Sequence, residues 1–107
     1  MTVRAYRRNQ IAVVEISGRF DAHVAPEVKI LLERADTPSQ VIVNLSGVNF
    51  IDSTALATLV GAMKRCRQKG GDLHLFGLQK PVRIIFELTK LDRAFELFDS
   101  EDAAVKA

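Results

Sequence analysis

The 107-residue sequence is poor in cysteine and proline, with one cysteine, three prolines and no tryptophan. A single thiol, Cys66, cannot form an internal disulfide, and no second thiol is present to help it hold a metal. The longest apolar runs, such as LATLV and VIV, fall far short of the roughly 20 residues of a membrane span. The amino terminus also lacks the basic-then-apolar pattern of a signal peptide. We therefore expect a cytoplasmic protein that does not insert into membranes.

The formal net charge of +2 is too small to indicate a nucleic-acid partner. Two basic clusters stand out, VRAYRRNQ at 3–10 and KRCRQK at 64–69. No nucleic-acid-binding motif accompanies them. The second cluster also falls at the end of a predicted helix, where cations complement the helix dipole. Cys66 lies in this cluster, so a reactive thiol of lowered pKa is one interpretation and a small residue at the edge of a buried stripe is the other.

The amino-terminal half shows strand and helix patterns that alternate. Residues 3–8 and 11–16 are predicted strands, and the polar pair Asn9 and Gln10 between them indicates a hairpin. SGRFDAH then reads as a turn around Gly18. Apolar positions from Val24 to Ala35 recur at helical spacing. The next segment, VIVNL at 41–45, lacks alternation and is typical of a central strand covered on both faces.

The carboxyl-terminal half continues the alternation. SGVNFID reads as a linker, followed by a helix over about 53–69 that KGG ends. DLHLFG is another predicted strand, in which Leu73, Leu75 and Gly77 alternate with His74 and Phe76, and Pro81 opens a third helix. RAFELF is a helical or extended patch before an acidic tail, which we expect to be loosely ordered from about 101. The order predicts one α/β domain over 1–107: a mixed, mainly parallel sheet with crossover helices, whose first strand is antiparallel through a hairpin.

The segment FIDSTALATL at 50–59 is the main candidate site. Asp52 and Ser53 suit the cap of the following helix. A hydroxyl at a helix amino terminus is also a favourable place for a phosphate, because free N–H groups and the helix dipole both attract an anion. The two roles are compatible, and ligands of such folds tend to use the loops at the carboxyl ends of parallel strands.

The sequence offers little support for catalysis or for a bound cofactor. His23 and His74 are the two histidines, and neither has metal-ligand spacing with another candidate. Gly70 and Gly71 follow a helix instead of opening one, so they do not form a phosphate-binding loop. His23 could approach Ser53, but no third group that would orient a catalytic dyad is evident. We expect no metal, no cofactor and no enzymatic activity.

Four segments in this order, GRFD, VIVNLSGVNFIDSTAL, KGGDLHLFGL and VRIIFELTKLDRAFELF, resemble the STAS domains of bacterial anti-sigma factor antagonists. The resemblance covers nearly the whole chain. It implies that Ser53 is phosphorylated by a partner serine kinase with bound ATP, which is itself the anti-sigma factor, and that a serine phosphatase reverses the mark. The unphosphorylated protein would bind the anti-sigma factor and free a sigma factor. Ala55 stands where the family commonly has glycine, and Thr54 is a secondary phosphorylation candidate.

The resemblance also implies a partner surface around Ser53. Asp52 belongs to the same motif, and Asp21 matches a family aspartate near the phosphorylated loop. A phosphate next to these carboxylates would concentrate negative charge on a surface that must dock, and so weaken binding. The expected partner-binding residues are Phe20, Asp21, His23, Phe50, Ile51, Asp52, Ser53 and Thr54. For Phe20 and Phe50, an apolar anchor on the surface and a plug at the top of the sheet are equally compatible with the sequence.

Two other functions fit parts of the sequence. Stand-alone STAS proteins also serve as constitutive subunits of larger assemblies, such as a lipid-transport ATPase complex, without a phosphorylation cycle. An enzyme that uses His23 and Ser53 is the alternative from another class.

Overall fold

The computed structural model describes residues 2–34 and 36–107. It opens with a hairpin of strands β1 (Thr2–Arg8) and β2 (Ile11–Phe20), which pair antiparallel. Asn9 lies in the turn with a positive φ of 58°. Asparagine tolerates this left-handed conformation better than most residues, which favours the tight turn.

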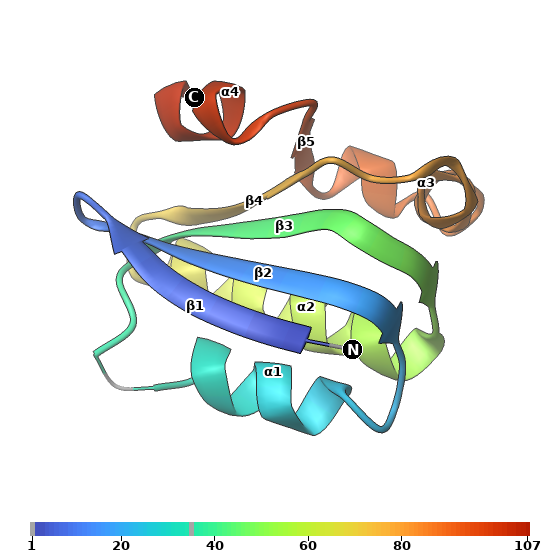
Figure 1. The fold of residues 1–107 in the computed structure, drawn as a ribbon. Coiled ribbons are helices and arrows are strands. Elements are labelled where there is room, and N and C mark those ends of the chain that lie inside the picture. Colours follow the sequence, from blue (N-terminus) through green and yellow to red (C-terminus); the bar gives the residue numbers. More distant parts are fainter. Residues whose placement is uncertain (1, 35) are drawn as a thin grey trace.

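The sheet has the strand order β1-β2-β3-β4-β5 (Figure 1). Strands β3 (Gln40–Ile51), β4 (Asp72–Phe76) and β5 (Glu96–Phe98) continue it, each parallel to its predecessor. The predicted mixed sheet with one antiparallel pair is thereby confirmed. Strand β5 lies in the segment predicted to be helical or extended, and the sequence could not decide between the two because three residues are too few to show a period.

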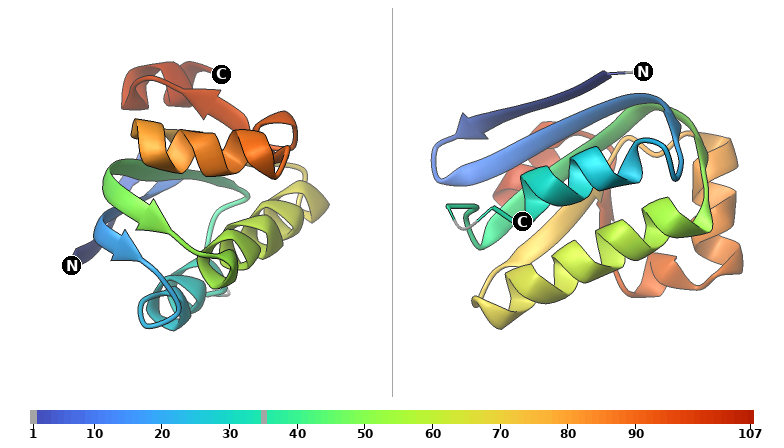
Figure 2. Two further views of the ribbon diagram at one scale, coloured as in Figure 1. Left: turned by 90° about the vertical axis from the view of Figure 1, so that its right-hand side faces the viewer. Right: turned by 90° about the horizontal axis from the view of Figure 1, so that it is seen from below.

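The described residues form four α-helices, which lie around the sheet (Figures 1 and 2). Helices α1 (Ala25–Leu32) and α2 (Ser53–Gln68) cover one face, here called the inner face. Helix α3 (Lys80–Leu88) packs against β3 and leads into a 3-10 turn, η1 (Leu91–Arg93). Helix α4 (Glu101–Lys106) lies on the opposite, outer face. The first helix was predicted to reach Ala35, which lies outside the described residues.

Two apolar clusters fill the space between helices and sheet. The inner cluster joins alternate residues of the strands to the buried faces of α1, α2 and α3; it includes Val14, Ile16, Val41, Val43, Leu45, Val28, Leu59, Leu73, Leu75 and Phe86. The outer cluster is much smaller and consists of Val13, Ile42, Phe76 and Ala104, with Ile11, Phe98 and Val105 packed against it. Burial of β3 on both faces explains why VIVNL shows no alternation.

Strands β2 and β3 are longer than the sequence predicted. The segment around Gly18, expected to be a turn, lies within β2, and SGVNFI, expected to be a linker, belongs to β3. The ladder between β2 and β3 shifts register between Glu15 and Ser17 and again between Gly18 and Arg19. Gly18 has a φ of 90°, which only glycine adopts easily, so a bulge carries the pairing through this polar segment.

The acidic tail is also more ordered than predicted, because α4 forms there. Ser100 caps α4, and its Oγ accepts a hydrogen bond of 3.1 Å from the amide of Ala103. Arg8 donates to Glu101 and Asp102 at 2.9 and 2.7 Å, and the hydroxyl of Tyr6 donates to Glu101 at 2.6 Å. The side chains of Tyr6, Arg8, Glu101 and Asp102 are together called the polar clamp below. They tie α4 to the end of β1.

The polar clamp changes the acidity of Tyr6. The hydrogen bond to Glu101 raises the pKa of Tyr6 from 10.0 to about 12. Asp102 responds in the opposite sense, since its hydrogen bond with Arg8 lowers the pKa of its carboxyl.

Candidate functional site

The candidate site lies at the carboxyl ends of β2 and β3, which are neighbours in the sheet. Arg19 pairs with Phe50 in the ladder, and Phe20 pairs with Ile51. The turn that follows β2 and the first turn of α2 are therefore brought together, as the left view of Figure 2 shows. The sequence placed its candidate residues at this same edge.

Asp52 joins the two loops through its carboxylate. One oxygen accepts a hydrogen bond from the amide of Ala55 at 2.9 Å, which caps α2. The other oxygen accepts from the amide of Ala22 at 2.9 Å, in the turn after β2. The amide of Asp52 itself donates to the carbonyl of Phe20 at 3.3 Å. The predicted capping role of Asp52 is confirmed, and the link to Ala22 was not predictable because it depends on strand register.

Ser53 is the first residue of α2 and is exposed, as is Thr54 after it. The hydrogen bonds of residues 2–34 and 36–107 include none donated by the amides of these two residues. Unpaired amides of a first helical turn attract an anion. A phosphoryl group on Ser53 would therefore meet free donors, and no existing hydrogen bond of the Ser53 hydroxyl would be broken.

Ala55 occupies the position at which the resembled family commonly has glycine. It is fully buried, with 0% of its surface exposed. Its methyl group therefore packs into the inner cluster and does not protrude beside Ser53. A partner that approaches Ser53 would not meet this methyl group.

The apolar candidates divide into buried and exposed residues. Phe20 is fully buried and Ile51 is 5% exposed, so both plug the top of the sheet and are not available as surface anchors. Phe50 is 37% exposed. The guanidinium carbon of Arg19 lies 3.9 Å from the centroid of the Phe50 ring, which is cation–π geometry. Arg19 was missed by the sequence analysis, although its place just before Phe20 and Asp21 could have suggested it.

Asp21 adds a second carboxylate to this edge. Its side chain is 22% exposed, and the Nε atom of Arg19 lies 3.7 Å from one of its oxygens. The other oxygen accepts a hydrogen bond of 3.0 Å from the amide of His23. The turn after β2 therefore contains Asp21 and accepts a contact from Asp52, and Arg19 partly balances the charge of Asp21.

The geometry does not assemble a catalytic dyad. The side chain of His23 is 95% exposed, and its Nδ1 atom lies 3.8 Å from Asp21. Within the described part of the chain, no hydrogen bond joins His23 to Ser53. His74 is buried below α4, with its Nδ1 atom 3.1 Å from the carbonyl of Ala104. No group of three histidine, cysteine or acidic residues among those the structure describes could hold a metal ion.

The other residues singled out by sequence have structural roles. Cys66 is buried, and burial raises the pKa of its thiol, so the interpretation as a reactive thiolate is wrong. Arg65 pairs with Glu33 at 3.0 Å, and Arg67 pairs with Asp72 at 3.0 Å. Two of the four cations in the basic cluster at 64–69 are therefore engaged in ion pairs within the chain.

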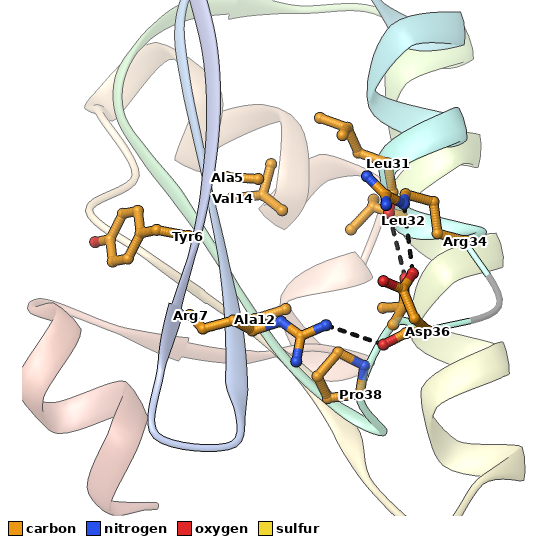
Figure 3. Close-up of a pocket in the computed structure, with 11 residues that line it drawn as sticks. Ala5, Tyr6, Arg7, Ala12, Val14, Leu31, Leu32, Arg34, Asp36 and Pro38 are labelled. Carbon is orange, nitrogen blue, oxygen red and sulfur yellow. Dashed lines mark hydrogen bonds and ion pairs between the residues drawn. The ribbon is translucent and has the colours of Figure 1, made fainter.

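A cleft of about 200 Å³ opens between β1 and the end of α1 (Figure 3). It carries two cations, but both already contact Asp36. Arg7 donates to the Asp36 carbonyl at 2.9 Å, and the Arg34 Nε atom lies 3.4 Å from its carboxylate. Because these cations are occupied, the cleft is a weak candidate for a ligand site.

Comparison with known proteins places this geometry in a family. The model of the STAS domain matches residues 2–104. The chain belongs to the STAS domain family. Among helices of residues 2–34 and 36–107, none is both long enough and apolar enough to cross a membrane.

Several proteins similar to this STAS domain are anti-sigma factor antagonists. The anti-sigma-B factor antagonist of Listeria monocytogenes is 36% identical over 88 residues, which cover 80% of this chain and 77% of that protein. The crystal structure of an anti-sigma factor antagonist from Mycobacterium paratuberculosis has a TM-score of 0.87 and 26% identity, and the match covers 98% of this chain and 91% of that one. The Bacillus cell fate determinant SpoIIAA in its phosphorylated form has a TM-score of 0.79 over 98% of this chain and 97% of that one. At 18% identity, the last likeness concerns the fold alone.

Proposed function

We propose that this STAS domain is an anti-sigma factor antagonist that acts by partner switching. In its unphosphorylated form it binds an anti-sigma factor, which is also a serine kinase with bound ATP, and a sigma factor is released. Phosphorylation of Ser53 weakens this binding, and a serine phosphatase restores it. The domain acts in the cytoplasm as ligand and substrate, and it catalyses no reaction itself.

The single observation that carries the proposal is the exposed Ser53 at the start of α2, directly after the fixed carboxylate of Asp52. A kinase can reach such a hydroxyl without unfolding the domain. The names of the relatives supply the biological context, since the Listeria monocytogenes protein is an anti-sigma-B factor antagonist.

The charge at this edge explains how a phosphate would act. A phosphoserine carries about −1.5 to −2 charges at neutral pH. Asp52 cannot turn away from it, because both of its carboxylate oxygens are held by backbone amides. Asp21 lies in the turn that Asp52 holds. The added charge would therefore repel an acidic partner surface and change the fold little.

The unphosphorylated surface has features suited to docking. Phe50 offers an exposed aromatic ring and Arg19 a cation stacked on it. Aromatic and arginine side chains are frequent anchors of protein interfaces. Arg19 would favour a partner with an acidic group at this point, which the phosphate would then compete with or repel.

The test begins with the phosphate occupancy of Ser53 and Thr54, measured by mass spectrometry on protein from its native cells during growth and under stress. Occupancy of Ser53 that differs between the two conditions supports the switch. Absence of phosphate in both conditions contradicts it and favours a constitutive subunit of a larger assembly.

Substitutions then separate the alternatives. Ser53→Ala should bind the anti-sigma factor constitutively, and Ser53→Asp should bind it at least tenfold more weakly, because the carboxylate imitates part of the phosphate charge. Thr89→Ala is the control, because Thr89 is an exposed hydroxyl residue at the end of α3 outside the predicted partner surface, and it should behave like the unsubstituted protein. Equal binding by Ser53→Ala and Ser53→Asp would refute the switch.

A further inference from the structure

A groove of about 510 Å³ runs between α1 and α2 on the far side of the inner cluster. The two helices lie side by side and run in the same direction, as the right view of Figure 2 shows. Their beginnings are joined by the bond from Ala22 to Asp52, and their ends by the ion pair of Glu33 and Arg65. The groove exists because the walls carry small apolar residues, namely Ala25, Pro26, Ala57 and Gly61. Its volume falls within the range of about 300–1,000 Å³ that small-molecule sites occupy.

Gly61 is the unusual residue of this groove. It lies in the middle of a 16-residue helix, where glycine disfavours helix formation relative to alanine. A Cβ atom at this position would meet only the Nη1 atom of Arg65, at an ordinary contact distance of 3.6 Å. Packing within the chain therefore does not require glycine. The missing side chain serves instead to keep the groove open.

The carboxyl-terminal part of the groove is positively charged and holds an unsatisfied donor. Arg65 and Lys29 both line it, against the single acidic group of Glu33. Among the described residues, no ion pair includes Lys29. The Nε atom of Arg65 is buried and, in residues 2–34 and 36–107, has no hydrogen-bond acceptor. A buried donor without an acceptor is costly, and a rotation of the Arg65 side chain that turns Nε towards an anion in the groove would remove that cost.

We propose that this groove is a binding site for a small organic anion with an apolar chain, such as a medium-chain carboxylate or phosphate monoester. The chain lies along Ala57 and Gly61, and the charged group contacts Arg65 and Lys29. In the cleft of Figure 3 both arginines contact Asp36, whereas in this groove Arg65 pairs with Glu33 and Lys29 takes part in no ion pair of the described residues. Thr54, next to Ser53, lines the other end of the groove, so the site is tested on the unphosphorylated protein.

The test is an NMR titration of the ¹⁵N-labelled protein with octanoate, octyl phosphate and neutral octanol. Both anions should produce saturable shifts at the amides of Ala57 and Gly61, and octanol should bind about tenfold more weakly because it cannot form the charge-assisted bonds. Binding by only one of the two anions would support the site and identify the charged group that it takes. Equal affinity for octanol and octanoate, or shifts spread evenly over the surface, would overturn the proposal.

Variants make the test specific to the groove. Gly61→Leu should fill it and lower the octanoate affinity at least tenfold, and Arg65→Gln should lower it about tenfold. Lys64→Gln is the matched control, because Lys64 is exposed, neighbours Arg65 and does not line the groove. It should change the affinity less than about twofold.

Gly61→Ala separates binding from folding. Alanine should raise the melting temperature, since it favours the helix, and still weaken octanoate binding. Equal losses in Arg65→Gln and Lys64→Gln, or full affinity in both Gly61 variants, would refute the site.

Discussion

The inner face of the sheet is covered by α1 and α2 through apolar side chains, whereas the outer face carries the six-residue helix α4, which is attached through the polar clamp and a few apolar contacts. Apolar burial depends little on salt or pH, while exposed ion pairs are screened by salt and vary with protonation. The two faces should therefore differ in how they open. The inner face should open only when the whole domain unfolds, and α4 should open locally.

The largest effect is expected on the inner face. Leu59→Ala removes a fully buried side chain of α2 and should lower the free energy of unfolding by about 3 kcal/mol. Urea denaturation followed by circular dichroism measures this. Leu88→Ala, at a residue that is 76% exposed, is the control and should cost less than about 0.5 kcal/mol. Similar losses in both variants would show that burial does not stabilise this face.

A smaller effect is expected where the inner face meets the candidate site. Ala55→Gly should lower the free energy of unfolding by about 1 kcal/mol for helix propensity, plus about 0.8 kcal/mol for the buried methyl group. Ala57 in the same helix is exposed, so Ala57→Gly should show only the loss of about 1 kcal/mol from helix propensity. The difference between the two denaturation curves measures the packing of Ala55. Equal costs would contradict its burial.

On the outer face the effect should be local. Arg8→Ala removes both ion pairs of the polar clamp to α4. Amide hydrogen exchange should become faster at residues 103–106 and stay unchanged in α2. High salt should produce the same pattern in the unsubstituted protein. Arg4→Ala is the control, because Arg4 pairs with Glu15 and not with α4. A parallel loss of protection in α2 would show that the faces do not open separately.

The smallest effect is a titration. Tyr6 is the only tyrosine and the chain has no tryptophan, so ultraviolet absorbance reports its ionisation alone. The midpoint should lie near pH 12, and Glu101→Gln should return it towards 10.0, because the carboxylate that accepts the hydrogen bond of the Tyr6 hydroxyl is gone. Glu15→Gln should shift it less, since Glu15 acts only through its charge. An unchanged midpoint in Glu101→Gln would show that the polar clamp does not form.

The hydrogen bond between Tyr6 and Glu101 also makes the stability of the folded protein depend on pH. Between about pH 10 and 12 the folded protein keeps the Tyr6 proton, while the unfolded chain releases it. The contribution of Tyr6 to stability is therefore complete below pH 10 and is lost as the pH rises towards 12.

The sequence predicted the order of the first seven elements because each carries its own period or its own stop signal. The central strand at 41–45 and the helix from Ser53 to Gln68 are examples. The sequence-based prediction was wrong where pairing between strands overrides the local preference of a residue. Gly18 was read as a turn because glycine suits both a turn and a bulge, and only the neighbouring strand decides between them. For His74 a satisfied and an exposed sheet position both remained open, because nothing in its own strand indicates that α4 covers it.

The candidate site was predicted only in part, because some of its contacts are local in sequence and others depend on strand pairing. The cap formed by Asp52 is a local pattern and was visible in the sequence. The bond from Ala22 to Asp52 and the stacking of Arg19 on Phe50 depend on the register between β2 and β3, which shifts at two places. The burial of Phe20 depends on that register as well.

The antiparallel hairpin decides where a fluorescent label would be useful. Thr2 lies opposite Ser17, near the end of β2 that leads to the candidate site, whereas α4 is fixed to Tyr6 and Arg8 near the hairpin turn. A dye attached at position 2 would therefore sense a protein that docks at Ser53, and a dye at position 106 would remain in solvent at the other end of the domain.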